Sequence, residues 1–283
     1  MGNKWRSRLF CHYLVIWKKH SMPELPEVNT VQRYFDEVAT GQRIEEVVVH
    51  DGHIIRNLSP DAFAERLTGR TFSGSYRRGK FLFAGLDNGH HVQLHLGMSG
   101  DLAYYTAPED EPKFCRFHFL LGDGGRLAFD CPRKLARILY IENLEAYIHE
   151  KQLGEDALRI GEDQFLQMMD GRSGTLKGFL MNQRHLAGIG NLYADEICYQ
   201  AEVHPASETG RIGTAKRRLL FRKMREILTF AVEKNAHYRK YPSDWLWKWR
   251  KEGHAGPDGK GEVQKMTIAG RTTYFLPEIQ TRY

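Results

Sequence analysis

A long region of alternating polar and apolar residues, from Arg43 to about Tyr140, restricts the fold of this chain more than any other feature. Apolar residues recur there at every second position, as in Val92, Leu94 and Leu96. Turn sequences, Asp-Asn-Gly at 87–89 and Gly-Asp-Gly-Gly at 122–125, separate the runs. A period of two places the apolar side chains on one face of a strand. The region therefore predicts an antiparallel β-sandwich or barrel.

Helical spacing flanks this region on both sides. Apolar residues from Val28 to Val38 recur every three or four positions, and Gly41 is a natural helix stop. Helical stripes return between residues 144 and 240, and the aromatic, basic tail from Trp245 onward ends in a short hairpin pattern. The predicted fold class is α+β and multidomain. No apolar run is long enough to span a bilayer.

The net charge of +6 comes largely from the first 21 residues, which hold five Lys and Arg residues and no acid. The rest of the chain balances 36 basic against 35 acidic residues, so overall charge is weak support for a nucleic-acid partner. The basic cluster between Lys216 and Arg225 fits phosphate contact and a solvated helix face equally well. Four cysteines without CxxC spacing predict a reducing, cytoplasmic location, at the nucleoid in a bacterium.

Residues 22–28, Met-Pro-Glu-Leu-Pro-Glu-Val, combine a helix start with reactive chemistry. If the chain begins at Pro23, its secondary amine titrates near pH ~8 and is partly unprotonated at neutral pH. Such an amine attacks an aldehyde-level carbon and forms an iminium. Ordinary helix capping explains the same residues without catalysis. The nucleophile requires that residues 1–21 be absent from the active enzyme.

A second motif, Leu-Ala-Gly-Ile-Gly-Asn at 186–191, lies between two helical segments. Its glycines allow the backbone to approach a phosphate closely, and Asn191 stands at a helix start. With these pieces in order, the chain resembles the formamidopyrimidine-DNA glycosylase / endonuclease VIII family from Met22 to Gln280. The stretches that carry the resemblance are 23–28, 78–82 (Arg-Gly-Lys-Phe-Leu), 95–100 (His-Leu-Gly-Met-Ser-Gly) and 187–196.

The resemblance implies a fold and a division into domains. Residues 1–21 are an extension, and residues 22–148 are expected to form a catalytic domain of one helix plus an antiparallel β-sandwich. A helix-two-turn-helix domain at 149–240 and a β-hairpin finger at 241–283 follow. The implied partner is double-stranded DNA with oxidised bases or abasic sites, bound by a monomer, and no membrane is involved.

The resemblance also assigns roles to individual residues. Pro23 attacks C1′ of the damaged nucleotide, and Glu24 is the acid/base that opens the sugar. Lys80, expected on a strand directly after a turn, contacts phosphate and assists proton transfer. Arg271 clamps the phosphates at the lesion. Further DNA-binding residues fill the extruded base's place (Met98), face the orphaned base (Arg133), part the base step (Leu135) or contact phosphate (Lys177 and Asn191). His95 is expected to lie near these phosphate ligands and to take part in DNA binding.

Two departures from the family pattern refine these expectations. Gly256, Gly259, Leu276 and Ile279 occupy the positions where many relatives carry four zinc-binding cysteines. The finger is therefore expected to be zincless and held by apolar packing, with no metal or organic cofactor in the protein. The apolar candidates are Val263, Met266, Ile268, Phe275, Leu276 and Ile279.

The second departure concerns the substrate. The segment between Phe230 and Trp245 is too short for the long loop that caps 8-oxoguanine in the purine-directed branch, and Phe114 replaces a DNA-contacting histidine. Oxidised pyrimidines, formamidopyrimidines or hydantoins are therefore the expected lesions.

The sequence thus predicts a bifunctional DNA glycosylase and abasic-site lyase of base-excision repair. The main alternative is a non-catalytic damaged-DNA-binding protein of the same fold, with Pro23 blocked by the extension. A helix-turn-helix regulator is a poorer alternative, because it leaves Pro23, Glu24 and Lys80 without a use.

Overall fold

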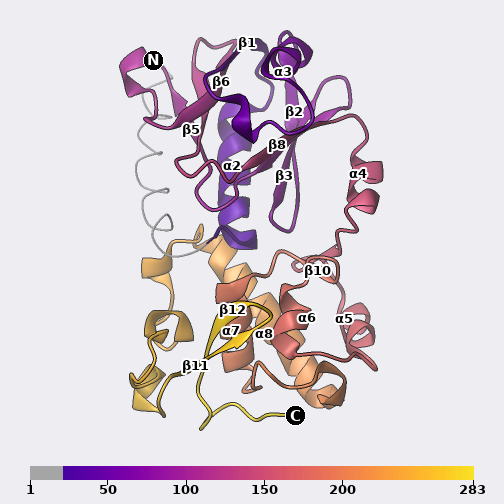
Figure 1. The fold of residues 1–283 in the computed structure, drawn as a ribbon, viewed down its shortest axis with the longest axis vertical. Coiled ribbons are helices and arrows are strands. Elements are labelled where there is room, and N and C mark those ends of the chain that lie inside the picture. Colours follow the sequence, from indigo (N-terminus) through magenta and orange to yellow (C-terminus); the bar gives the residue numbers. More distant parts are fainter. Residues whose placement is uncertain (1–21) are drawn as a thin grey trace. The chain divides into compact units, whose positions relative to one another are not determined.

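The computed structural model describes residues 22–283, which form two compact units that divide between Gln152 and Leu153 (Figure 1). The expectation about residues 1–21 lies outside the described residues. The predicted boundary between 148 and 149 falls inside helix α4 (Leu144–Glu150), which belongs entirely to the first unit. Among residues 22–283, no helix combines the length and apolar character needed to cross a membrane.

The first unit is built on two four-stranded antiparallel sheets, as the alternating pattern predicted. One sheet has the order β1-β6-β7-β5 and the other β2-β3-β4-β8. The strands are β1 (Ile44–Val49), β2 (Phe72–Arg78), β3 (Phe81–Leu86), β4 (His91–His95), β5 (Asp101–Tyr105), β6 (Cys115–Leu121), β7 (Arg126–Asp130) and β8 (Arg137–Ile141). One large buried apolar cluster takes side chains from both sheets. Leu82 and Ala84 of β3 come from one sheet, and Phe117 of β6 comes from the other.

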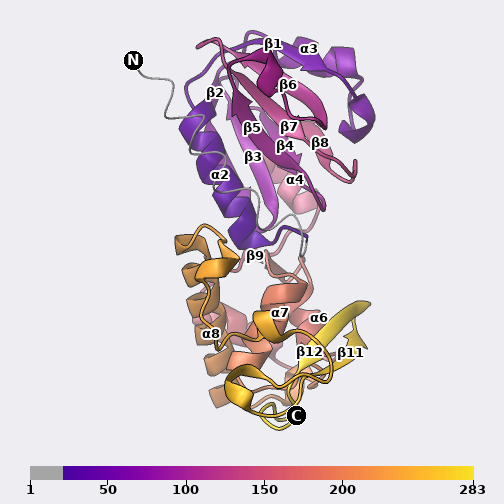
Figure 2. The same cartoon turned by 90° about the vertical axis from the view of Figure 1, so that its left-hand side faces the viewer.

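Helix α2 (Leu25–Ala39) packs along one side of both sheets, against β2 and β3 of one and β5 of the other (Figure 2). Its apolar stripe, Val28, Val31, Phe35 and Val38, is buried in the core as predicted. Helix α3 (Pro60–Leu67), inside the strand region, was not predicted from the sequence. Its signals are local: Ser59 caps the helix by accepting the Ala62 N–H, and Pro60 stands at the first turn.

The second unit is mainly helical. Its helices are α5 (Glu162–Met169), α6 (Leu176–Met181), α7 (Asn191–Gln200) and α8 (Thr214–Glu233). Two short strands, β9 (Glu155–Asp156) and β10 (Leu186–Ala187), pair in parallel. Helix α7 packs against α6, α8 and strand β12 (Arg271–Phe275). It therefore connects the helical part of the unit to the C-terminal finger.

The finger contains the predicted hairpin, β11 (Gln264–Ile268) paired with β12. Val263 and Leu276 are fully buried and pack with Leu246, while the partly buried Tyr274 and Ile279 pack against this cluster. Phe275 and Ile268 are also buried, whereas Met266 is half-buried. A Cβ atom at Gly256 would overlap the Leu276 side chain. The Leu276 side chain therefore packs directly against the backbone at Gly256. Many relatives are expected to carry cysteines at these two positions.

Candidate active site

Pro23 and Glu24 lie directly before α2, and both are buried. Glu24 is the N-cap residue, and its backbone N–H donates to the Glu27 carboxylate at 2.8 Å. This contact satisfies a backbone donor that the helix cannot. Leu25 is fully buried behind it. The first turn of α2 therefore fixes the position of the Pro23–Glu24 dipeptide.

Lys80 reaches the same end of the first unit through strand β2. Gly41, which follows α2, donates its N–H to the carbonyl of Phe72, the first residue of β2, at 2.8 Å. The 15-residue helix rises about 22 Å and the 7-residue strand about 23 Å. Because β2 packs back along α2, the turn after β2 returns to the beginning of the helix.

The sequence placed Lys80 on a strand, but the structure places it in a two-residue hairpin turn with Gly79. Arg78 pairs with Phe81 across this turn, and Gly79 has a positive φ of 58°. Two-residue hairpins require such a conformation at their first position, which glycine adopts without strain. The half-buried Lys80 side chain therefore starts from the hairpin tip rather than from the face of a sheet.

His95, the last residue of β4, lies beside Lys80. Its ring centroid is 5.0 Å from that of Phe81, and Arg137 of β8 is its cross-strand neighbour. Burial, followed by the charges of Arg137 and Lys80, lowers the pKa of His95 to about 4. The Gly97 N–H donates to His95 Nδ1 at 3.1 Å, so the neutral ring carries its proton on Nε2. His95 is therefore a neutral hydrogen-bond donor.

We expect the His95 ring to stay neutral between pH 8 and 5. The unfolded chain binds this proton near pH ~6.5 and the folded chain near pH 4, so the stability that His95 contributes is present above pH ~6.5 and is lost as pH falls to 4. Nitrogen-detected NMR of the ring would show the Nε2–H tautomer throughout. A His95 midpoint above pH 6 would contradict the argument.

The residues predicted to fill the DNA stack come from two adjacent loops. Met98 is half-buried in the turn after β4, whereas Arg133 and Leu135 are exposed on the loop between β7 and β8. Ser99 Oγ accepts the Arg133 backbone N–H at 3.3 Å, which joins the loops. Gly97, with φ of 61°, lies so close that a Cβ there would overlap the Leu135 carbonyl. The structure thus brings these three predicted residues together.

Sequence reasoning missed the residues that hold the Arg133 loop in place. Arg116 of β6 donates from Nε to the Cys131 carbonyl at 2.8 Å and from Nη2 to the Pro132 carbonyl at 3.3 Å. Asp51 bridges Arg116 and Lys134, at 3.2 and 2.7 Å. The Lys134 hydrogen bond is the main cause that lowers the pKa of Asp51. No local motif marks these residues, because they act through long-range contacts.

In the second unit, Arg271 is the first residue of β12 and is exposed. The hairpin tip before it is formed by Ala269 and Gly270, with φ of 48° and 71°. Two successive positive φ values are typical of a type I′ turn, which matches the twist of a hairpin. Arg271 therefore lies next to the tip of the finger, and its role as a phosphate clamp stays a prediction.

The structure places Lys177 differently from the prediction of phosphate contact. Its side chain has 0% exposure, and its Nζ lies 2.6 Å from Asp195 Oδ1 of α7. It also donates to Thr273 Oγ1 at 2.7 Å. Burial lowers the pKa of Lys177, which the Asp195 carboxylate opposes. Lys177 therefore links helix α7 to strand β12, which begins at Arg271, because its partners are Asp195 of α7 and Thr273 of β12.

Asn191 is the first residue of α7, after the glycine turn predicted from the sequence. Gly188 has a φ of 123°, and Gly190 is an N-cap without a side chain. The Asn191 side-chain oxygen is buried and has no hydrogen-bond partner within the described part of the chain. The backbone geometry of this turn is the one expected for close approach of a phosphate.

Comparison with known proteins assigns the family. Residues 22–138 match the profile of the formamidopyrimidine-DNA glycosylase N-terminal domain, and residues 153–241 match the formamidopyrimidine-DNA glycosylase H2TH domain. The formamidopyrimidine-DNA glycosylase of Solibacter usitatus is 31% identical, over 92% of this chain and 100% of its own. This chain belongs to the formamidopyrimidine-DNA glycosylase family. The predicted family and enzyme class, a DNA N-glycosylase, are thereby confirmed.

Other members of the formamidopyrimidine-DNA glycosylase family are similar to this chain in sequence or in structure. The enzyme of Arabidopsis thaliana is 31% identical, over 93% of this chain and 72% of its own. The Lactococcus lactis protein, solved in a complex with abasic-site DNA, is 26% identical with a TM-score of 0.82, over 92% of this chain and 100% of its own. A second complex of that protein contains FAPY-dG DNA and has the same TM-score of 0.82. The predicted fold is therefore confirmed, while the roles of individual residues remain predictions.

Proposed function

We propose that this family member is a bifunctional DNA glycosylase and abasic-site lyase that acts through the amine of Pro23 on double-stranded DNA. The observation that best supports this proposal is the return of the Lys80 hairpin turn to the Pro23–Glu24 end of helix α2. A nucleophile, a carboxylate and an ammonium group then belong to one end of one unit. His95 adds a neutral donor beside Lys80.

The proposed reaction begins when the Pro23 nitrogen forms a bond to C1′ and the bond from C1′ to the damaged base breaks. The base leaves with the electron pair and takes up a proton, and Glu24 protonates the ring oxygen as the sugar opens to an iminium. Loss of a C2′ proton then expels the 3′ phosphate, and water releases Pro23. Lys80 and Arg271 neutralise phosphate charge during strand cleavage.

In a chain that still contains residue 22, the Pro23 nitrogen is part of a peptide bond. Its electron pair is delocalised into the carbonyl group and is not available for attack. The mechanism therefore requires a chain that begins at Pro23.

We also propose that the enzyme works in the cytoplasm, where the thiols stay reduced. The described cysteines, Cys115, Cys131 and Cys198, are free and buried.

We propose oxidised pyrimidines, formamidopyrimidines or hydantoins as the preferred lesions. The segment after α8 supports this choice, because Tyr238 and Tyr241 are buried and the rings of Tyr241 and Trp245 lie 4.9 Å apart. These aromatic contacts fix the segment against the second unit. It does not supply a long, free loop to cover a purine lesion.

We expect faster excision of formamidopyrimidine and 5-hydroxyuracil than of 8-oxoguanine opposite cytosine, by about 10-fold or more, or about 1.4 kcal/mol in barrier. Single-turnover assays on duplexes that differ only in the lesion would measure this ratio. A preference for 8-oxoguanine would overturn the substrate assignment. It would leave the glycosylase activity itself intact.

Gly97→Ala is expected to lower base excision by about 10-fold or more, because the added Cβ overlaps the Leu135 carbonyl and the backbone has a positive φ. Gly89→Ala is the matched control, since Gly89 also has a positive φ, 81°, but no atom lies within 4 Å of an added Cβ. Equal losses of activity in the two variants would show that backbone strain alone, rather than contact between the loops, matters.

A further inference from the structure

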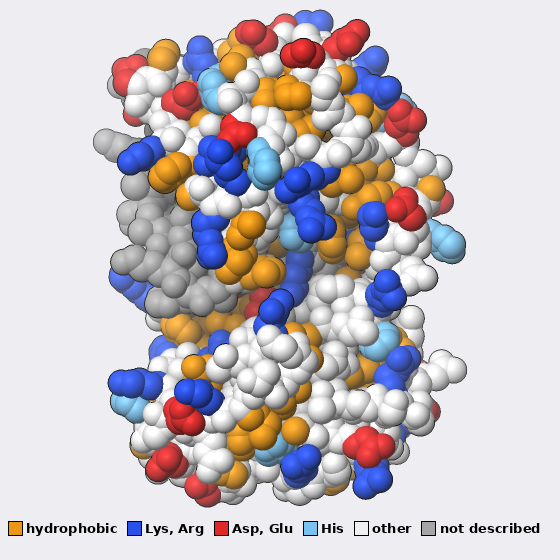
Figure 3. All heavy atoms as spheres, in the orientation of Figure 1, with side chains coloured by type: hydrophobic (Ala, Val, Ile, Leu, Met, Phe, Trp, Pro, Cys, Tyr) orange, Lys and Arg blue, Asp and Glu red, His pale blue; other side chains and the backbone are white. Residues whose placement is uncertain are grey.

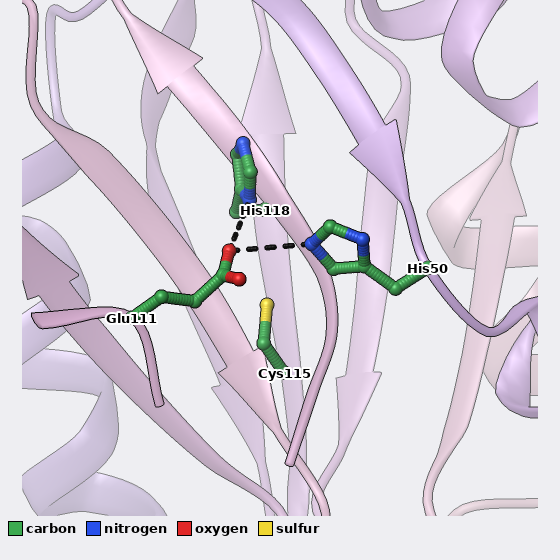
Figure 4. Close-up of side chains that lie close together, drawn as sticks. All are labelled: His50, Glu111, Cys115 and His118. Atoms are coloured by element: carbon green, nitrogen blue, oxygen red, sulfur yellow. Dashed lines mark hydrogen bonds and ion pairs between the residues drawn. The ribbon is translucent and has the colours of Figure 1, made fainter. Parts of the chain in front are cut away.

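Four side chains with metal-binding atoms meet on the sheet β1-β6-β7-β5, and none of them has been assigned a role in catalysis. His50 follows β1, Glu111 follows the short 3-10 helix η3 (Pro108–Asp110), and Cys115 and His118 belong to β6. Figure 4 shows the two histidine rings converging on the Glu111 carboxylate, with the Cys115 sulfur beneath them. Their potential ligand atoms all lie within 4.8 Å of one another.

A β-bulge brings Cys115 and His118 to the same face of the sheet. Residues three apart on a regular strand point to opposite faces. Here the pairing of β6 with β7 shifts between Cys115 and Phe117, so Cys115 opposes Asp130 while Phe117 opposes Phe129. Phe117 points into the core and Cys115 to the other face. Bulges of this kind redirect side chains and are frequent beside functional sites.

Strand register also places His50 on that face. Val48 pairs with His118, and His50 lies two residues beyond Val48. The rings of His50 and His118 are 5.5 Å apart between centroids. Glu111 Oε1 lies 3.2 Å from His50 Nε2 and 3.1 Å from His118 Nδ1. Three segments of the chain therefore deliver nitrogen, oxygen and sulfur atoms to one point.

The donor set fits tetrahedral zinc. Zinc binds imidazole nitrogen, thiolate sulfur and carboxylate oxygen at about 2.0–2.3 Å, which places neighbouring ligand atoms about 3.3–3.6 Å apart. The exposed side chains of His50 and Glu111, 40% and 35% accessible, can make the required contraction and give access from solvent. Cys115 and His118 are buried and fixed. Tyr105 Oη donates to Glu111 Oε1 at 2.7 Å and orients the carboxylate, as outer partners of metal ligands do.

We propose that His50, Glu111, Cys115 and His118 bind one Zn²⁺ ion. The Cys115 thiol gives its proton to solvent as the zinc–sulfur bond forms. The site ties the end of β1 and the β5–β6 connection to β6. Asp51, directly after His50, holds Lys134 in the loop that carries Arg133, so bound zinc stabilises the support of that loop.

Titration of the full chain with Co²⁺, in place of zinc, tests the proposal. We expect one Co²⁺ per chain, with thiolate-to-cobalt absorption in the near ultraviolet and the strong visible bands of tetrahedral cobalt. Zn²⁺ should displace the cobalt and raise the unfolding temperature. Cys115→Ser should lose the thiolate band and the zinc-dependent rise in unfolding temperature.

His50→Asn removes an exposed ligand and tests the site even if Cys115→Ser fails to fold; it should weaken Zn²⁺ binding by about 10-fold or more. His149→Asn, at another exposed histidine, should leave Zn²⁺ binding unchanged. Cys11→Ser should also leave the spectrum unchanged, although Cys11 and His12 are adjacent in the sequence. The absence of tetrahedral Co²⁺ bands, or bands that survive in His50→Asn and vanish in Cys11→Ser, would overturn the proposal.

Discussion

Protein that begins at Pro23 is expected to form at least ~100-fold more borohydride-trapped adduct with abasic-site DNA than the 283-residue chain. In the longer chain the Pro23 nitrogen is an amide and forms no iminium that borohydride can reduce. Pro23→Gly, also as the first residue, has a primary amine in place of the secondary amine and should trap the DNA at an intermediate level. Gel separation of the reduced adducts would measure all three proteins on one duplex.

DNA binding by the same proteins separates catalysis from recognition. The arginine at the finger tip and the loops that carry Met98 and Leu135 do not depend on a free amine. Comparable affinity with loss of trapping would therefore assign the nucleophile to Pro23. Tight binding without any adduct, even when Pro23 is the first residue, would instead favour the non-catalytic reader of damaged DNA.

Local patterns in the sequence predicted those elements in which one periodicity dominates. The strands between Ile44 and Ile141 follow the period of two, and α2 follows its apolar stripe into the core. The hairpin of the finger can be predicted from the Ala269–Gly270 turn and the apolar residues on either side of it. Basic side chains and histidines gather across the middle of the first unit's face in Figure 3, which charge counting over the whole chain could not show.

Contacts between segments that are distant in the sequence could not be predicted from local sequence patterns. A lysine that binds phosphate and a lysine buried in an ion pair have the same sequence signature, so the resemblance assigns phosphate contact to Lys177. Its position is decided by Asp195 and by Thr273, which is 96 residues away. The proposed zinc ligands were missed for a similar reason, because strand register and a bulge, rather than motif spacing, bring them together.

Asp195 is the centre of the contacts that attach the finger to the helices of the second unit. Its Oδ1 lies 2.6 Å from Lys177 Nζ, and its Oδ2 lies 2.8 Å from Arg250 Nη2. The Tyr274 N–H of β12 donates to Oδ2 at 3.2 Å. Burial opposes both charges of the Lys177–Asp195 pair, but a guanidinium group keeps its charge in proteins, so the contact with Arg250 favours the ionised form of Asp195.

Asp195→Asn is expected to lower the free energy of unfolding of the second unit by about 3–5 kcal/mol, because the buried Lys177 and the partly buried Arg250 lose their counter-charge. Glu202→Gln is the control; it removes an exposed pair with Lys216, at 3.2 Å, and should cost less than about 1 kcal/mol. Tryptophan fluorescence during urea unfolding measures this unit, because protein beginning at Pro23 contains only Trp245, Trp247 and Trp249.

The same variant should bind abasic-site DNA more weakly, because Lys177 and Asp195 hold the strand that begins at Arg271. Arg271→Ala, which removes the clamp but no buried charge, should lose DNA affinity while its unfolding midpoint stays near that of the parent protein. If Asp195→Asn unfolds at the same urea concentration as Glu202→Gln, the buried pair is not ionised in the folded protein. The finger would then be held by its apolar cluster and by hydrogen bonds such as that from Lys177 to Thr273, without a charge pair.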